Sequence, residues 1–390
     1  MPSSRLVFAQ LMAHLPLHTF RRLVSKYEGN RYTKRLGCLD QFLAMAYAQL
    51  TARDSLREIV VCLRAQQSKL YHAGIGTPIS RSTLADENES RDWRIYAEFA
   101  HALIATTRRL YADEPLGIEL EQTVYALDST TIDLCLSAFP WAPAIHSGKG
   151  GIKLHTLLDI RGAIPCVIHV DAARRHDINM LDRLPIEPGA IYLMDRGYLD
   201  FKRLYRIHTS GAFFIMRSKR HLNLKRLRSM PVTDRAQIIC DQLVAARGEE
   251  ASERYFEPLR RLRLRDMDSG GVIALLTNQL TLPSTAIGSL YRQRWQIEIF
   301  FRWIKQHLRI RSFLGRSANA VKTQVWIAVA IYVLVAIVRK RMGVQVSLRT
   351  MLQALSAAVF EETPLETPFS PANAHIGEPV PANQLNLFGD

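Results

Sequence analysis

The chain has 390 residues, 48% of them hydrophobic, so it can bury a sizeable core in two or three domains and is neither disordered nor fibrous. Lysine and arginine outnumber aspartate and glutamate by 51 to 36, and the resulting net charge of +15 favours a polyanionic partner over acidic substrates or neutral metabolites. The 5 cysteines are scattered without a Cys-x-x-Cys pair, which argues against a disulfide framework and against a zinc knuckle.

The first 115 residues or so are predicted to be helical. Apolar side chains recur there at helical spacing in three segments, 39–50, 56–63 and 93–110. A helix from Ser55, a glycine and proline turn at 74–78, and a second helix opening at Ser80 have the order of a helix-turn-helix, whose second helix enters a major groove. Such a pair is more often plain packing, so both interpretations stay open.

From Thr123 the apolar period changes to that of β-strands. Five β-rich runs follow, at 123–134, 151–160, 164–172, 190–195 and 212–218. Short turns separate the first three, which can form an antiparallel meander, whereas helical connections lead to the fourth and fifth, as in parallel crossovers. The pattern predicts a mixed five-stranded α/β sheet in which the first and fourth strands are neighbours.

The alternation of strands and helices breaks at residues 220–283. We interpret this stretch as a β-rich insertion with a basic segment at 220–228, a helical patch at 237–246 and strand-like runs at 260–265 and 272–277. One amphipathic helix over 284–310 is expected next. The apolar run 325–338 is shorter than the roughly 18 residues that span a bilayer, so we expect a helix buried on all sides rather than a membrane span.

Two aspartates interrupt apolar strands. Asp128 lies inside the first strand, and Asp195 follows the fourth. A lone buried carboxylate costs several kcal/mol unless a cation or hydrogen bonds compensate it. For either aspartate alone a capping role is as plausible as a ligand role, but neighbouring strands would bring the two together, and a divalent cation would remove their repulsion.

A third acidic group lies on the helix at 291–305. At about 100° per residue, four of its side chains fall within roughly a 60° arc beside an apolar face: Tyr291, Arg294, Glu298 and Lys305. One glutamate among cations could be a solvated ion-pair partner, but the alignment favours a site. Residues 201–235 and 291–316 together carry the whole excess of positive charge, next to Asp195 and around Glu298, where a phosphate backbone would pass.

These residues carry a resemblance. Asp128 in a strand, Asp195 in Asp-Arg-Gly-Tyr, and the spacing Tyr-x2-Arg-x3-Glu-x6-Lys that begins at Tyr291 resemble the DDE transposases of the insertion-sequence-four family with its YREK signature. The similarity covers nearly the whole chain. It implies an α/β fold with a ribonuclease H-like mixed five-stranded sheet, a β-rich insertion and an N-terminal all-helical domain.

The resemblance also implies an activity. Asp128, Asp195 and Glu298 would be catalytic and would hold two Mg2+ (or Mn2+) ions for phosphoryl transfer on DNA. The protein would bind terminal inverted repeats, cleave the element ends and join the 3′ ends to target DNA, as a homodimer on paired ends. Tyr291, Arg294 and Lys305 would be DNA-binding residues that contact phosphates.

The domain organisation follows from the resemblance and the element pattern together. We expect a helical DNA-binding domain at 1–115, a first part of the catalytic core at 116–219, the insertion at 220–283, a second part of the core at 284–345, a C-terminal helix at 346–360 and a disordered tail at 361–390. The tail carries a pentapeptide similar to those that dock on the replication sliding clamp, with its contacts at Gln384, Leu385, Leu387 and Phe388. It could instead fold back on the core.

Other polar residues give weaker signals. His146, Lys149, Lys153 and His155 surround the second strand, and we expect structural or phosphate-contact roles rather than metal ligation. No signal peptide is recognisable, so a cytoplasmic, nucleoid-associated protein is expected. The alternatives are a catalytically silent DNA-end-binding protein or repressor of the same fold, a nuclease that cuts without joining, and a two-carboxylate glycosidase, which would leave the basic charge without a purpose.

Overall fold

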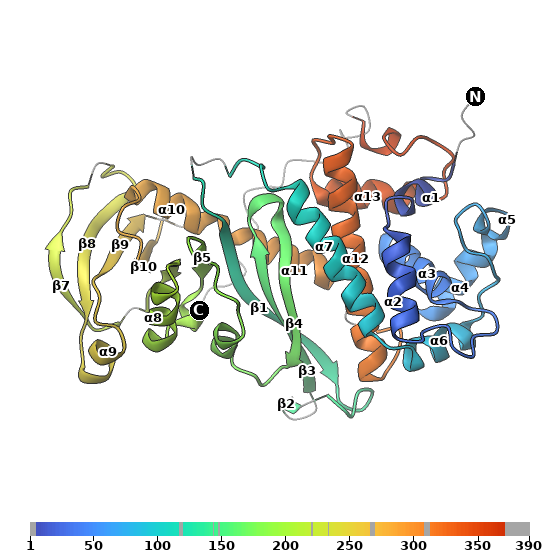
Figure 1. The fold of residues 1–390 in the computed structure, drawn as a ribbon, viewed down its shortest axis with the longest axis horizontal. Helices are drawn as coiled ribbons and strands as arrows, with labels where there is room; N and C mark the ends of the chain where they lie inside the picture. The colour runs from blue at the N-terminus through green and yellow to red at the C-terminus, as the bar shows by residue number, and fades with distance from the viewer. Residues whose placement is uncertain are drawn as a thin grey trace. The chain divides into compact units, whose positions relative to one another are not determined.

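A computed structural model describes residues 5–116, 120–142, 144–146, 149–219, 221–232, 234–265, 270–307 and 313–370 (Figure 1). The chain divides into two compact units. The first consists of 1–103, 312–315 and 323–390, and the second of 104–311 and 316–322. Two helices, α7 (Arg94–Leu110) and α12 (Ala318–Arg341), contribute to both units. The domain boundaries predicted from the sequence remain a prediction.

The first unit is helical. Before α7 it contains α1 (Val7–Met12), α2 (Leu17–Lys26), α3 (Cys38–Leu50), α4 (Leu56–Ala65), α5 (Gln67–Leu70) and α6 (Arg81–Ser90). Ser55 and Ser80 cap α4 and α6, because each hydroxyl accepts a hydrogen bond of 3.1 Å from the backbone N–H three residues later. Both helices of the expected helix-turn-helix therefore form, with α5 between them, and groove binding remains a prediction.

The apolar run near the C-terminus forms α12. This helix is long and apolar enough to cross a membrane, but 94% of its most apolar window is buried inside the protein, as expected for a core helix. Helix α13 (Leu348–Ala358) follows. A disordered tail from residue 361 is wrong for 361–370, because Leu365 and Phe369 are buried there, and the short helix η4 (Thr367–Phe369) forms. The clamp-like motif lies outside the described residues.

The second unit contains the predicted five-stranded sheet. Its strands are β1 (Val124–Cys135), β3 (Lys149–Asp159), β4 (Ile164–Ala172), β5 (Ile191–Met194) and β6 (Phe213–Arg217), and the short β2 (Ala144–His146) also pairs with β3. The pairs β1–β3 and β3–β4 are antiparallel, whereas β1–β5 and β5–β6 are parallel. The first and fourth predicted strands are therefore neighbours, and the ribonuclease H-like mixed sheet is confirmed.

The insertion extends this sheet. From β6 outward the order is β10 (Val272–Thr277), β9 (Leu259–Arg265), β8 (Ile238–Ala246) and β7 (Leu224–Ser229), all antiparallel, which gives ten strands in the described chain (Figure 1). The helical patch predicted at 237–246 is wrong, because these residues form β8. Pairing with β7 and β9 satisfies the backbone there and overrides a helix-like apolar spacing. Helix α9 (Glu249–Arg254) connects β8 to β9.

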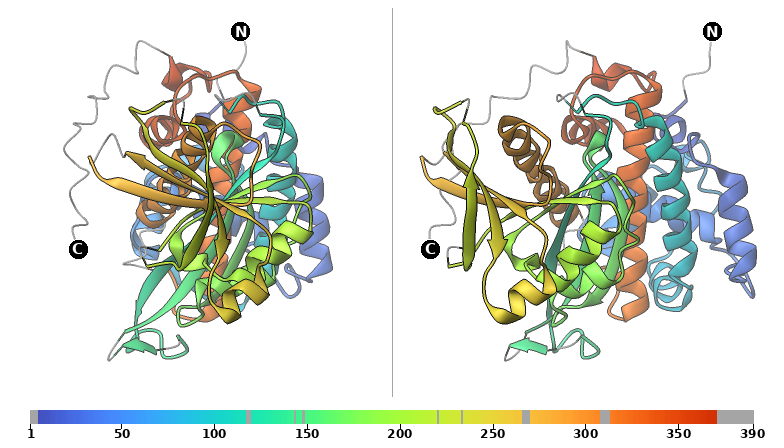
Figure 2. Two further views of the ribbon diagram at one scale, coloured as in Figure 1. Left: turned by 90° about the vertical axis from the view of Figure 1, so that its left-hand side faces the viewer. Right: turned by 60° about the vertical axis from the view of Figure 1, so that its left-hand side comes forward.

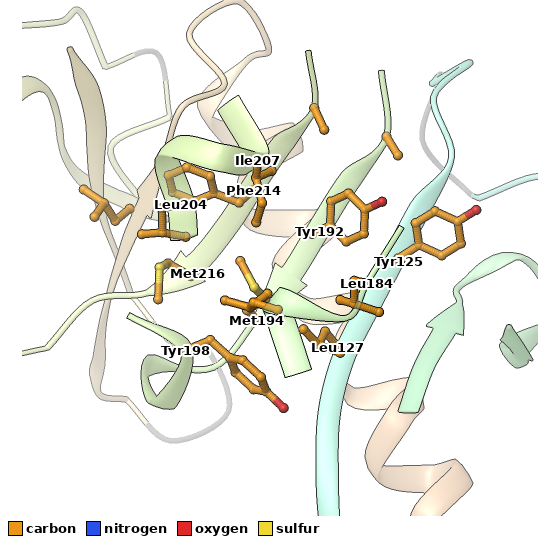
Figure 3. Packing of buried hydrophobic residues seen from close by; sticks show 14 of the residues in the cluster. Tyr125, Leu127, Leu184, Tyr192, Met194, Tyr198, Leu204, Ile207, Phe214 and Met216 are labelled. Atoms are coloured by element: carbon orange, nitrogen blue, oxygen red, sulfur yellow. The ribbon is translucent and has the colours of Figure 1, made fainter. Parts of the chain in front are cut away.

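One face of the sheet carries a continuous apolar core. Leu204 and Ile207 of α8 (Phe201–Thr209) are fully buried and pack over Tyr192, Phe214 and neighbouring strand residues (Figure 3). The other helical connections are short 3-10 turns: η1 (Arg161–Ala163), η2 (Asp177–Asp182), where a helix was expected, and η3 (Arg196–Tyr198). Odd-numbered residues of β1 such as Leu127 face this core, so the side chain of Asp128 points to the opposite face.

Two helices replace the single helix predicted over 284–310. They are α10 (Ser284–Gln293) and α11 (Trp295–His307), and they are separated at Arg294. The N–H of Arg294 donates to Tyr291 O and the N–H of Ile297 donates to Arg294 O, so three-residue hydrogen bonds interrupt the helical ladder. Helix α10 packs closely on β9, because a Cβ on Gly288 would lie only 3.1 Å from a methyl carbon of Leu264. Figure 2 shows these elements from two further sides.

Candidate active site

Asp128 lies in the middle of β1, which β3 and β5 flank on either side. Its Oδ1 accepts a hydrogen bond of 2.8 Å from the backbone N–H of Ser129. Burial raises the pKa of this carboxyl to about 6, against the lowering effect of the Arg294 guanidinium and of that hydrogen bond, while Glu298 and Asp195 raise it further. Arg294, Glu298 and Asp195 therefore all act on the Asp128 carboxyl.

Arg294 joins two of the predicted site carboxylates. Its Nη1 lies 3.1 Å from Asp128 Oδ2, and its Nη2 lies 2.6 Å from Glu298 Oε1. The first contact connects β1 to the junction of α10 and α11, across 166 residues of sequence, and the second is an i,i+4 pair along the helix. A single guanidinium therefore balances two carboxylates in a largely buried position.

Asp195 and Tyr291 lie next to this pair. Asp195 follows β5 directly and precedes η3, so it is at the carboxyl end of the strand beside β1. Tyr291 is buried on α10, and Arg294 Cζ lies 5.9 Å from the centre of its ring. Burial raises the pKa of the Tyr291 phenol, Arg294 opposes this change, and Asp195 adds to it. Both residues therefore lie within electrostatic reach of the site.

Lys305 is the predicted site residue that the structure does not join to the others. It is exposed on α11, two turns beyond Glu298. Among the interactions of the described residues, none links its ammonium group to Asp128, Asp195 or Glu298. An exposed lysine at the margin of a buried acidic site is available to a ligand that extends past the site.

Behind Asp128 a second polar network supports β1. Ser129 points to the opposite face, and its Oγ donates a 2.6 Å hydrogen bond to Asp177 Oδ1. Lys153 Nζ lies 2.9 Å from the same carboxylate oxygen and also donates to Arg175 O. The sequence did not identify Ser129 or Asp177. The only signal was that Ser129 follows Asp128 in a strand, and nothing indicated that η2 would supply its partner.

His155, in the second predicted strand, contacts carboxylates outside the acidic site. His155 is buried, with its two ring nitrogens each 3.9 Å from a carboxylate oxygen, of Asp171 and of Asp177. Burial lowers the pKa of this imidazole, and the two aspartates oppose that change. The side chains of His146 and Lys149 lie outside the described residues. Lys153 and His155 therefore make structural contacts in this conformation, which is one of the two roles expected from the sequence.

The donor chemistry of the site suits a hard divalent cation, because Asp128, Asp195 and Glu298 offer only carboxylate oxygens. Three carboxylates against one shared guanidinium leave an excess of negative charge, which a metal ion would offset. Across the described parts of the chain, no three acidic, histidine or cysteine residues are gathered closely enough to ligate one ion. In this conformation the Arg294 guanidinium lies between Asp128 and Glu298 instead.

Comparisons with known proteins agree with this chemistry. A family model described as "Transposase DDE domain" matches residues 119–334, and one described as a domain of unknown function matches residues 3–76. The protein named transposase y4zB in Sinorhizobium fredii is 33% identical over 308 residues, which cover 77% of this chain and 81% of that protein. A transposase for insertion sequence element IS5377 in Geobacillus stearothermophilus is 28% identical over 59% of this chain and 58% of its own length.

A third relative is more distant. The transposase for insertion sequence element IS4SA in a Synechocystis strain is 23% identical, over 66% of this chain and 72% of its own length. The matched family model spans all of the strands from β1 to β10 as well as α10 and α11. Asp128, Asp195 and Glu298 therefore all lie within the matched region.

Proposed function

The chain belongs to the family of DDE transposases of insertion sequences, and we propose that it cleaves DNA at the inverted-repeat ends of its element and joins the freed 3′ ends to target DNA. The observation that carries this proposal is the Arg294 guanidinium shared between Asp128 and Glu298. That contact connects the junction of α10 and α11 to β1, and it supports a shared site for residues that are distant in sequence. A purely structural arrangement would not need three carboxylates for one cation.

In this proposal Asp128, Asp195 and Glu298 hold two Mg2+ (or Mn2+) ions. When bound, such ions would lower the pKa of an attacking water or 3′-hydroxyl and stabilise the leaving oxygen of an in-line displacement. The side chains of the protein would hold the ions and orient the phosphate. The Ser129 N–H fixes one Asp128 oxygen. Arg294, once it leaves the carboxylates, would pair with a phosphate as a bidentate donor.

Tyr291 and Lys305 would extend the phosphate contacts along the same helices. The exposed Lys305 would bind as a point charge, and Tyr291, whose ring contacts the Arg294 guanidinium, would contact a phosphate beside it. The DNA would be double-stranded, comprising both the inverted repeats and the target, and the protein would act as a homodimer on paired ends in the cytoplasm, associated with the nucleoid.

Cleavage of a labelled duplex that carries the element end tests the proposal. With Mg2+ or Mn2+, the wild type should nick or form a hairpin at the element boundary. Asp128→Asn, Asp195→Asn and Glu298→Gln should each lose cleavage while DNA binding survives, because every substitution removes a charge at nearly constant shape. Asp200→Asn is a suitable control, since Asp200 caps α8 and pairs with Arg203 rather than with Arg294. Cleavage that persists in all three variants would disprove this active site.

A catalytically silent DNA-end-binding protein or repressor is the second candidate. It predicts that the wild type binds the element end but does not cut it under any metal condition. Docking on the sliding clamp through Gln384, Leu385, Leu387 and Phe388 is a separate proposal. Deletion of the last seven residues, 384–390, should abolish clamp pull-down and leave end cleavage unchanged.

A further inference from the structure

Three arginines alternate along one strand of the insertion. Arg261, Arg263 and Arg265 are at every second position of β9, so they lie on one face of the sheet, and we call them the arginine ladder. Arg263 and Arg265 are exposed, while Arg261 is half-buried with no hydrogen-bond partner for its Nε. The intervening Leu262 and Leu264 point to the other face, against α10.

The neighbours of the ladder on its own face are uncharged. Its cross-strand partners are Gln242 and Leu276 for Arg261, Cys240 and Ala274 for Arg263, and Val272 for Arg265. No carboxylate ion-pairs with a ladder arginine in the described chain. Asp266 and Asp268, in the connection that follows β9, lie outside the described residues.

Three arginines in a row destabilise the folded protein unless an anion compensates their charge. Residues two apart on a strand are separated by about 6.8 Å, so the three guanidinium groups repel one another. The preceding residue shows the usual solution, because Arg260 faces the other way and forms a buried pair with Asp241 at 2.6 Å. A row of uncompensated arginines on an open strand face is typical of a surface that binds a polyanion.

The register relates the ladder to the candidate active site. Arg261 is opposite Leu276, which is opposite Met216, and the same row continues through Met194 to Leu127, the residue before Asp128. Four strand spacings separate β9 from β1, which amounts to about 19 Å. Paired residues of neighbouring strands point to the same face, so the ladder belongs to the face of Leu127, which is opposite to that of Asp128. The sheet twist of about 20–25° per strand turns the ladder by roughly a right angle from that face over four strands.

We propose that the arginine ladder binds phosphates of double-stranded DNA on a part of the duplex at least about 19 Å, or about six base pairs, from the cleaved phosphate. The ladder spans about 14 Å, which covers about four base-pair steps at about 3.4 Å each. Its role would be positioning without base reading, because arginines on a flat strand face reach the backbone of a duplex. This inference rests on the proposed function for the identity of the DNA.

The salt dependence of binding tests the ladder directly. The triple variant Arg261→Gln, Arg263→Gln, Arg265→Gln should lower the slope of log affinity against log salt by about three, since each lost phosphate contact removes about 0.9. Between 50 and 200 mM salt its affinity should therefore fall about 40-fold less than that of the wild type. The triple lysine variant at the same positions should keep the wild-type slope, which separates loss of charge from loss of fold.

A matched control removes a charge that already has a partner. Arg183 is partly exposed and pairs with Asp171 at 2.8 Å, so Arg183→Gln changes the net charge as Arg263→Gln does. Only Arg263→Gln should reduce the salt slope, by about one. If both substitutions reduce it equally, the effect belongs to net charge, and the ladder is not a site.

Duplexes with shortened arms test the distance. Wild-type affinity should drop when the arm is trimmed from twelve to four base pairs, whereas the triple glutamine variant should respond little. An unchanged salt slope and an equal response to trimming in the triple variant would overturn the inference even if the wild type cleaves element ends. A reduced slope in a protein that never cleaves would uphold the ladder and reject the catalytic proposal.

Discussion

Two arginine–carboxylate contacts made by strands of the same sheet, one buried and one partly buried, serve different purposes. In the insertion, Arg260 and Asp241 form two hydrogen bonds of 2.9 and 2.6 Å, and Arg260 also donates to Leu282 O. At the candidate active site, Arg294 gives one contact to Asp128 and another to Glu298. The first pair has one cation for one carboxylate and little access to water, with side-chain exposures of 7% and 2%.

The difference separates a pair that holds the fold from a group that is open to a ligand. The Arg260–Asp241 pair is balanced in charge and bidentate in geometry, so it has no uncompensated charge that would attract a ligand. The Arg294 group is short of positive charge, because Asp195 adds a third carboxylate to its surroundings. Charge that is buried without compensation lowers the stability of the folded protein. Proteins tolerate such a loss of stability mainly at functional sites.

Breaking the balanced pair should have the largest effect on stability. Asp241→Ala leaves a buried guanidinium without its carboxylate, and removal of one partner of a buried pair costs about 3–5 kcal/mol. Urea denaturation of the metal-free protein should show this loss in the free energy of unfolding. The double variant Asp241→Leu, Arg260→Met should regain most of it, because an apolar pair of similar volume has no charge to leave unpaired.

Neutralising Asp128 should change the free energy of unfolding in the opposite direction. Asp128→Asn removes a carboxylate whose burial is unfavourable, so at pH 8 without metal it should raise the free energy of unfolding by about 1–3 kcal/mol. It should also reduce cleavage by more than the roughly 100-fold that loss of an outer-shell partner costs. A destabilisation as large as that of Asp241→Ala would mean that the Asp128 pair is structural, and the contrast between the two pairs would fail.

The pH dependence sharpens the same contrast. The pKa of Asp128 is raised to about 6 in the folded protein, against about 3.9 in an unfolded chain. Between these values the folded state binds the proton more tightly, so this group's contribution to stability is complete below pH 4 and is lost as the pH rises to 6. The difference in unfolding free energy between Asp128→Asn and wild type should grow over that window and stay constant above it. Asp159, whose pKa is also raised to about 6, contributes equally to both proteins and cancels.

The two halves of the sheet also differ in how well the sequence predicts them. The five core strands could be predicted because buried β-rich runs are bounded by turns and glycines. The sequence IICDQLVAA of β8 fits a helix as well as a strand, and only its pairing partners decide between them, so the helix predicted at 237–246 was wrong. Tertiary pairing is not visible in a local pattern.

The same limit applies to the candidate site. The spacing of the YREK residues predicts that Arg294 and Glu298 share a helix face, and the i,i+4 contact confirms their proximity. It does not predict that this face meets β1, nor that the helix breaks at Arg294, because both are tertiary features that a local spacing does not contain. The roles of the three carboxylates stay a prediction until cleavage is measured.

The smallest expected effect concerns the support behind Asp128. Ser129→Ala removes the 2.6 Å hydrogen bond to Asp177 but keeps the backbone N–H that binds Asp128 Oδ1. Cleavage should fall about 10-fold through the maximal rate, equivalent to about 1.4 kcal/mol, with DNA affinity unchanged, because the strand carrying the carboxylate is held less rigidly. Ser129→Thr should restore most of the rate, since it retains the hydroxyl donor.

Single-turnover cleavage at saturating DNA measures the maximal rate. Asp177→Asn should lower that rate by a similar factor, because it changes the same contact. The contrary outcome is that Ser129→Ala lowers DNA affinity and leaves the maximal rate unchanged. The contacts of Ser129 and Asp177 would then serve DNA binding, and they would not be a support for the reacting carboxylate.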